Sequence, residues 1–220
     1  QGFAQAQLKL GVRYGRGEGV AKNEKEQVWW FRKAAEQGLP EAQFNLGVRY
    51  SQGQGVAKDE KEAVRWFRKA AEQGEPEAQF NLGVKYDEGQ GVLKNEKEAT
   101  RWFRLAAEQG LALAQFNLGV NYVQGKDVAK NEKEAVLWYR KAAEQGVPEA
   151  QFNLGVRYGQ GQGVAKDEKE AMRWCRLAAE QGFAQAQFNL GVWYSHGQGV
   201  LKNEKEATRW YRLAAEQGDA

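Results

Sequence analysis

Residues 38–73 read GLPEAQFNLGVRYSQGQGVAKDEKEAVRWFRKAAEQ, and this stretch of 36 residues decides the fold. The same pattern fills almost the whole chain of 220 residues, with units at 2–37, 38–73, 74–109, 110–145, 146–181 and 182–217. A fixed period of this length is typical of proteins in which each repeat stacks on the next. We therefore expect one array over residues 1–220, in which residues 218–220 begin a further repeat that is truncated or absent. Because the first residue is Gln rather than Met, we also expect a processed or excised piece.

The second half of the unit predicts an amphipathic helix. Apolar residues between 63 and 71 recur at i, i+3, i+4, i+7 and i+8, which places them on one helical face. Asp59, followed three residues later by Glu62, is typical of a helix N-terminus. Gly74 follows the last apolar position and favours a left-handed C-cap.

The first half of the unit predicts another helix, which begins near Pro40. Leu46 and Gly47 share the face that points to the second helix. A helical Gly costs about 1 kcal/mol relative to Ala, so its recurrence in every unit indicates a close approach of backbones, with Trp66 or a neighbouring helix filling the space. The glycines of residues 51–58 supply the positive φ angles of the turn between the helices.

One helical hairpin cannot bury both of its apolar faces, and stacking on its neighbours completes its core. The expected fold is therefore all-α: a right-handed α-α superhelix, or solenoid, of six helix-turn-helix repeats of 36 residues. The first helices are expected to line its concave surface. The handedness is taken by analogy with other helical-hairpin repeats.

Two consensus strings of the unit resemble a known family. They are A-Q-F-N-L-G-V-x-Y-x-x-G-x-G-V and W-[FY]-R-[KL]-A-A-E-Q-G, and together they cover nearly the whole chain. They are similar to the Sel1-like repeat, a relative of the tetratricopeptide repeat. The resemblance implies an adaptor or scaffold that binds other proteins rather than an enzyme. It also implies a bacterial protein and favours the periplasm or cell surface, although the residues themselves leave the compartment unknown.

Composition argues against several other classes of protein. Lys and Arg number 32 against 29 Asp and Glu, and a net charge of +3 is too balanced to suggest a nucleic-acid partner. No apolar run approaches the roughly 20 residues that a membrane helix needs, so no membrane insertion is expected. A single Cys excludes an intrachain disulfide.

Groups able to perform catalysis are few. The chain has one His, one Cys and two Ser, and neither Ser51 nor Ser195 begins the Ser-x-x-Lys motif of β-lactamase-like chemistry. Cys175 takes an aromatic position on the core face, which is typical of a small buried side chain. We expect no catalytic residues, no metal site and no cofactor.

A stripe on the first helix remains for a partner. It contains an asparagine row, which is Asn45, Asn81, Asn117, Asn153 and Asn189. A second row runs beside it, with Arg13, Arg49, Lys85, Asn121, Arg157 and Trp193, and His196 lies close to its end. Asn amides suit the backbone of an extended peptide, and Arg or Lys could hold ligand carboxylates. The hypothesis is a concave groove for an extended peptide or protein segment; alternatively, the Asn side chains bridge adjacent repeats and stiffen the array.

Other readings of the whole chain stay open at the level of sequence. A purely structural or engineered array without a dedicated ligand is the main alternative, and a secreted hydrolase is a remote one. The apolar side of the last helix, with Trp210 and Tyr211, is expected to be exposed to solvent. End-to-end self-association is therefore a further expectation.

Overall fold

The computed structural model describes residues 2–217, which form helices joined by turns, without a strand among them. The first residue and residues 218–220, where we expected a further repeat to begin, lie outside the described part. The helices of the described residues are α1 Gly2–Arg16, α2 Glu24–Glu36, α3 Pro40–Gln52, α4 Glu60–Glu72, α5 Pro76–Glu88, α6 Glu96–Glu108, α7 Ala112–Gln124, α8 Glu132–Glu144, α9 Pro148–Gln160, α10 Glu168–Glu180, α11 Ala184–His196 and α12 Glu204–Glu216. The predicted all-α class of two helices per repeat is confirmed.

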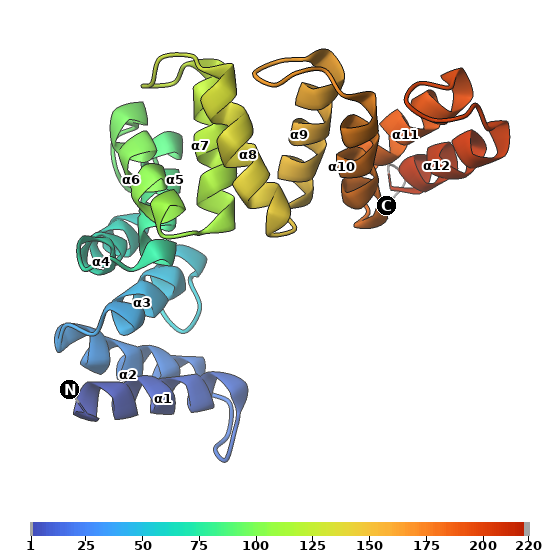
Figure 1. The fold of residues 1–220 in the computed structure, drawn as a ribbon. Helices are drawn as coiled ribbons and strands as arrows, with labels where there is room; N and C mark the ends of the chain where they lie inside the picture. The colour runs from blue at the N-terminus through green and yellow to red at the C-terminus, as the bar shows by residue number, and fades with distance from the viewer. Residues whose placement is uncertain (1, 218–220) are drawn as a thin grey trace. The chain divides into compact units, whose positions relative to one another are not determined.

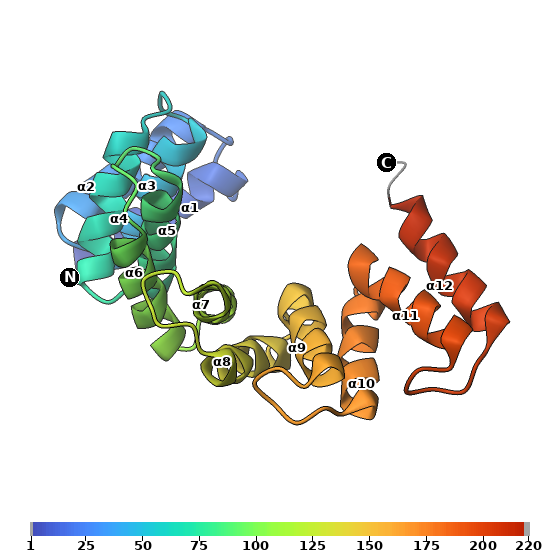
Figure 2. The same ribbon diagram turned by 90° about the horizontal axis from the view of Figure 1, so that it is seen from above.

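The chain divides into two compact units, Gln1–Gln109 and Gly110–Ala220, and the division falls between two repeats. The first unit holds the hairpins α1–α2, α3–α4 and α5–α6, and the second holds α7–α8, α9–α10 and α11–α12 (Figures 1 and 2). Within each unit, the second helix of one repeat packs against the first helix of the next. Each unit is thus stacked as predicted, whereas the single array and the handedness of its superhelix stay predictions.

Capping follows the sequence pattern closely. The Asp59 carboxylate accepts hydrogen bonds from the backbone N–H groups of Lys61 and Glu62 at 2.9 and 3.0 Å, which satisfies two free donors at the start of α4. Gly74 has a φ of 93° and lies one residue beyond the C-cap, which is Gln73. Its N–H donates to the Ala71 carbonyl at 3.0 Å and so ends α4.

The glycines in the middle of the first helices sit against the second helix of their own repeat, on an aromatic ring in five repeats and on Cys175 at Gly155. A Cβ built on Gly47 would lie 2.7 Å from the nearest ring carbon of Phe67. The space beside Gly47 is thus filled by the neighbouring helix α4, as one of the two alternatives had it, but through the side chain of Phe67 rather than by the backbone, and the suggestion of Trp66 was wrong. Trp66 instead joins a buried cluster with Val28 and Ala35 of the preceding repeat.

Contacts between repeats are equally regular. A Cβ on Gly55 would collide with the carbonyl oxygen of Glu24, so this turn rests on the preceding repeat. The buried Gln43 donates to the Ala35 carbonyl at 3.1 Å. Arg68 donates to the Tyr86 hydroxyl of the next repeat at 2.8 Å. Hairpin cores are therefore completed by neighbours, through both apolar and polar contacts.

Packing against the preceding repeat also corrects one expectation, namely that Trp210 of the last helix is exposed to solvent. Trp210 is buried, because its indole packs into a cluster with Met172 and Ala179 of the preceding repeat. Tyr211, Leu213 and the last alanines of α12 are the apolar residues of this helix that are partly or fully exposed. None of the helices within residues 2–217 is both long and apolar enough to cross a membrane.

Candidate partner-binding surface

The asparagine row lies on the first helices α3, α5, α7, α9 and α11, and each of its side chains is partly exposed. Asn81 donates from Nδ2 to the Glu77 carbonyl of its own helix at 2.8 Å. Within each unit, no hydrogen bond of the described residues joins one Asn of the row to the next. The alternative in which these amides bridge adjacent repeats is therefore not what the structure shows within a unit.

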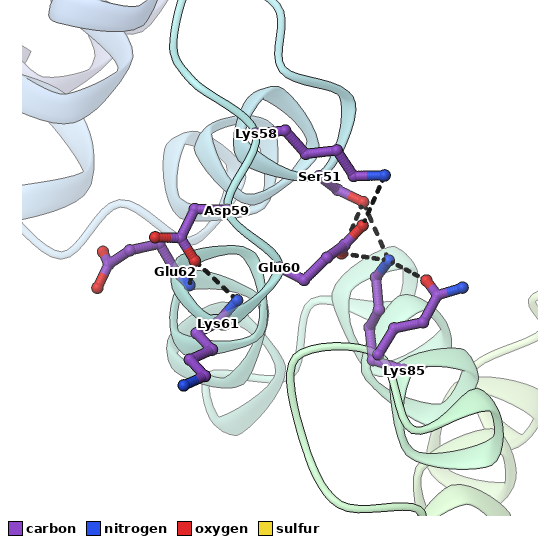
Figure 3. A network of polar contacts seen from close by, with 8 residues as sticks. Ser51, Lys58, Asp59, Glu60, Lys61, Glu62 and Lys85 are labelled. Carbon is purple, nitrogen blue, oxygen red and sulfur yellow. Dashed lines mark hydrogen bonds and ion pairs between the residues drawn. The ribbon is translucent and has the colours of Figure 1, made fainter.

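The second row behaves differently, because two of its cations, Lys85 and Arg157, pair with acids of the preceding repeat. Lys85 is only 8% exposed, and its Nζ donates to Glu60 Oε2 at 2.7 Å, to Gln90 Oε1 at 2.8 Å and to Ser51 Oγ at 3.0 Å (Figure 3). Glu60 and Ser51 belong to the preceding repeat. Lys85 was expected to await a ligand carboxylate; it is wrong to treat it as free, since a carboxylate of the protein already occupies it.

The pKa of Glu60 reflects this contact. Burial raises the pKa of the carboxyl, but hydrogen bonds and positive charge from Lys85 and Lys58 outweigh burial and hold the pKa below its ordinary value. The charged form is thus the stable one in the folded protein. Glu60 contributes to the attachment of one repeat to the next.

The second unit repeats the arrangement with arginine. Arg157 Nη1 donates to Glu132 Oε2 at 2.8 Å and also to Gln162. Its side chain is only 13% exposed, so it too is unavailable to a ligand. Asn121 is buried as well. Arg49 donates to Gln54 of the following turn.

The remaining residues of the second row differ from these. Arg13 is exposed, and Trp193 is partly exposed. His196 is exposed at the end of α11, and its Nδ1 lies 2.9 Å from both the Val192 carbonyl oxygen and Ser195 Oγ. Of the predicted site residues, the structure therefore leaves the asparagine row, Arg13, Trp193 and His196 accessible.

Sequence reasoning missed the acidic partners of the second row. Glu60 and Lys85 are 25 residues apart, and Glu132 and Arg157 have the same separation. A helical wheel compares residues of one helix and does not compare α4 with α5. A comparison of each acidic residue with the basic residues of the following repeat could have found both pairs.

An apolar hollow of about 620 Å³ borders the row in the second unit. Phe188, Tyr211 and Asn189 are among the residues that line it. Phe188 is 54% exposed, the most exposed aromatic ring on the first helices of this unit. A pocket with apolar walls and a few polar groups is the usual form of a side-chain binding site.

Chemistry-bearing groups are few in the described residues. Cys175 is fully buried, and burial raises the pKa of its thiol to about 12, which confirms the predicted core role. A search of residues 2–217 finds no group of three or more His, Cys, Asp or Glu side chains that could hold a metal ion.

Fold and surface together define a class: an all-α repeat protein of stacked helical hairpins. The model of the Sel1 repeat matches residues 4–39, 40–75, 76–111, 112–147, 148–183 and 184–219. The chain belongs to the Sel1 repeat family. The matched units begin two residues after the predicted ones, close to the start of each first helix, and the period is the same. Sel1 repeat proteins are generally non-catalytic scaffolds for protein interactions.

Solved structures of bacterial proteins resemble the chain. A protective antigen present in uropathogenic Escherichia coli strains, which displays this repeat fold, is 42% identical with a TM-score of 0.93; the match covers 98% of this chain and 46% of that one. A Sel1 repeat protein from Oxalobacter formigenes is 40% identical with a TM-score of 0.85, covering 96% and 84%. An immunity protein from Pseudomonas aeruginosa, at 23% identity and a TM-score of 0.54 over 97% and 81%, shares the fold. The chain thus spans less than half of the first of these proteins. Among curated proteins, none matches its sequence.

Proposed function

We propose that the chain is a protein-interaction scaffold that binds an extended peptide segment along the asparagine row. The observation that carries the proposal is the state of the row: its side chains are partly exposed and make no hydrogen bond to the next Asn within a unit. Each Asn offers two donors and one acceptor, which matches the N–H and C=O groups of a peptide backbone.

Folding alone gives no reason for Asn at these positions. Asn is a weaker helix former than Ala, and the five residues occupy the middle of first helices rather than caps or turns. The apolar hollow beside Asn189 adds a place for one bulky side chain of the bound segment. The proposal no longer includes Lys85 and Arg157, because Glu60 and Glu132 occupy them.

The experiment uses unit two, where three members of the row follow one another. Peptides that bind the chain are selected from a displayed random library, and their affinity is measured by fluorescence anisotropy for the wild type and for the triple variant N117A/N153A/N189A. We expect at least tenfold weaker binding, since each lost hydrogen bond contributes about 0.5–1.5 kcal/mol. The variant should fold at least as well as the wild type because Ala favours helix.

The matched control places three alanines on the second helices of the same unit. Glu144, Glu180 and Glu216 are exposed there, and their replacement should leave the affinity unchanged. Unchanged affinity in the Asn variant would discard the row as the binding surface. Failure of the library to yield any binder would favour the array without a dedicated ligand.

A further inference from the structure

Filled repeat junctions share one polar arrangement. At the α4–α5 junction, Glu60 receives Lys58 on Oε1 at 3.2 Å and Lys85 on Oε2 at 2.7 Å. At the α8–α9 junction, Glu132 receives Lys130 on Oε1 at 3.3 Å and Arg157 on Oε2 at 2.8 Å. We call Lys85 and Arg157 the junction cations. Each also donates to a Gln five residues later in its own repeat.

At the α10–α11 junction, Glu168 and Gln198 stand where the other two junctions have their accepting Glu and Gln, but the junction cation is replaced. Glu168 receives Lys166 on Oε1 at 2.8 Å, but Trp193 stands where the junction cation would be. Among the described residues, Lys166 is the cation that pairs with Glu168, and no cation of α11 joins it. The Glu168 side chain is 52% exposed, compared with 23% for Glu60 and 28% for Glu132. Gln198, the counterpart of the accepting Gln, is exposed too.

A cavity of about 130 Å³ lies at this junction. Its lining includes Glu168, Trp193 and Gln198, together with Gly159, Lys166 and Ala171. A Cβ on Gly159 would meet only the Ala171 Cβ, at 3.6 Å, so this wall has room. The cavity is large enough for several waters and therefore for the flat head of one side chain.

We propose that this cavity binds the guanidinium group of an arginine in a partner peptide, which takes the place of the missing junction cation. The group would donate to Glu168 Oε2 and to the Gln198 amide oxygen, as Arg157 does to Glu132 and Gln162. The indole of Trp193 adds a flat π surface, on which arginine stacks better than lysine.

The site deepens the proposed function and rests on it. Trp193 follows Asn189 by four residues on α11, so the two side chains lie on the same helical face. A peptide running along the asparagine row of unit two reaches the cavity within one helical turn. Lys166 pairs with the same carboxylate at 2.8 Å, as Lys58 does with Glu60 and Lys130 with Glu132, and in those two junctions the lysine and the junction cation share one carboxylate.

The first experiment follows the Trp193 indole N–H signal in a two-dimensional ¹⁵N NMR spectrum during titration with acetyl-Gly-Arg-Gly-amide. We expect a saturating shift. The citrulline analogue, which keeps the shape and lacks the charge, should produce no shift. Glu168→Gln should weaken binding about tenfold, because a hydrogen bond to a charged group contributes more than a neutral one. An unmoved signal, an equal response to citrulline, or unchanged binding in E168Q would each overturn the proposal.

A second experiment fills the cavity with an arginine of the protein itself. Trp193→Arg restores the residue type of Arg157, so the variant should fold normally, pair with Glu168 and lose peptide binding. Its matched control is Trp29→Arg, which makes the same exchange at an exposed position of α2 where most repeats carry Arg, and which should bind like the wild type. Undiminished tripeptide binding in W193R, followed by the signals of the other residues at this junction, would contradict the proposal.

The two proposals can fail separately. Library-selected peptides that bind the asparagine row, together with an unmoved Trp193 signal, would keep the scaffold function and remove the arginine site. Binding of the tripeptide with no effect of the triple Asn variant on selected peptides would remove the row and keep the cavity.

Discussion

Gly83 offers a direct test of the packing between the two helices of a repeat, because one added methyl group meets a ring. A Cβ at this position would lie 2.7 and 2.8 Å from two ring carbons of Phe103 and 3.3 Å from the Ala99 carbonyl oxygen. Carbon atoms in contact prefer a separation of about 3.5–4.0 Å. The ring, which is buried, therefore has to move by close to 1 Å.

Two effects of opposite sign compete in Gly83→Ala. The helix gains about 1 kcal/mol of propensity, and overpacking costs about 1–3 kcal/mol. Because two ring atoms are affected and the ring is enclosed, we expect the upper part of that cost and a net loss of about 1–2 kcal/mol. In thermal unfolding this corresponds to a melting temperature lower by about 2–8 °C for a chain of this size.

Gly159→Ala is the matched control, since it adds the same methyl group to a helix with space around it. Its Cβ would meet only the Ala171 Cβ at 3.6 Å. Overpacking is then absent, and a gain of up to about 1 kcal/mol is expected. Both variants are compared with the wild type by circular dichroism during thermal and urea unfolding. A stabilised G83A, or equal effects in both variants, would refute the packing argument.

Three further changes test other parts of the structure. Lys85→Met should cost about 1–3 kcal/mol at pH 7. Because the folded pKa of Glu60 is lowered, the part of this cost that comes from the ion pair is present above the ordinary Glu pKa near 4.3 and is lost as pH falls through the folded value. The lost hydrogen bonds to Ser51 and Gln90 leave a remainder at low pH, and urea unfolding at several pH values measures both parts. Cys175→Phe should destabilise by about 1–3 kcal/mol through overpacking, because the ring of Phe183 packs beside Phe152 against the cluster that contains Cys175. Adding Phe183→Leu should recover part of this loss in thermal unfolding, and no recovery would contradict this role of Phe183. Asp127→Gly should stabilise by up to about 1 kcal/mol because Asp127 has a φ of 50°, and an unchanged urea midpoint would contradict it.

Local features of the fold could be predicted well, since their causes lie within one helix or turn. Asp59 and Gly74 mark the ends of α4 through hydrogen bonds that reach only a few residues. The apolar period likewise places Leu46 and Phe67 in the core. Trp66 could not be assigned in the same way: one helical wheel shows that it is apolar, but not that it packs against the preceding repeat.

The binding surface was only partly predictable for a related reason. Exposure of Asn45 or Asn153 depends mainly on its own helix, and the wheel placed both at the surface, where they are partly exposed. Exposure of Lys85 depends on whether an acid lies across the junction, and Glu60 does so from the preceding repeat. A basic residue that recurs at a polar position of the repeat can therefore still be buried, when an acidic residue of the preceding repeat pairs with it.

Departures from the repeat fall into two kinds, and the distinction indicates where a ligand belongs. Cys175 removes a ring from the core, but Phe152 pairs instead with Phe183 at 5.3 Å between centroids, so the loss is compensated inside the protein. Trp193 removes the junction cation, and Glu168 keeps only Lys166 among the cations of the described residues. A partly solvated carboxylate tolerates this loss at little cost to folding. A substitution that removes the junction cation and leaves a cavity beside its acceptors is open to an external cation, and for this reason the α10–α11 junction is the first place to look for the ligand.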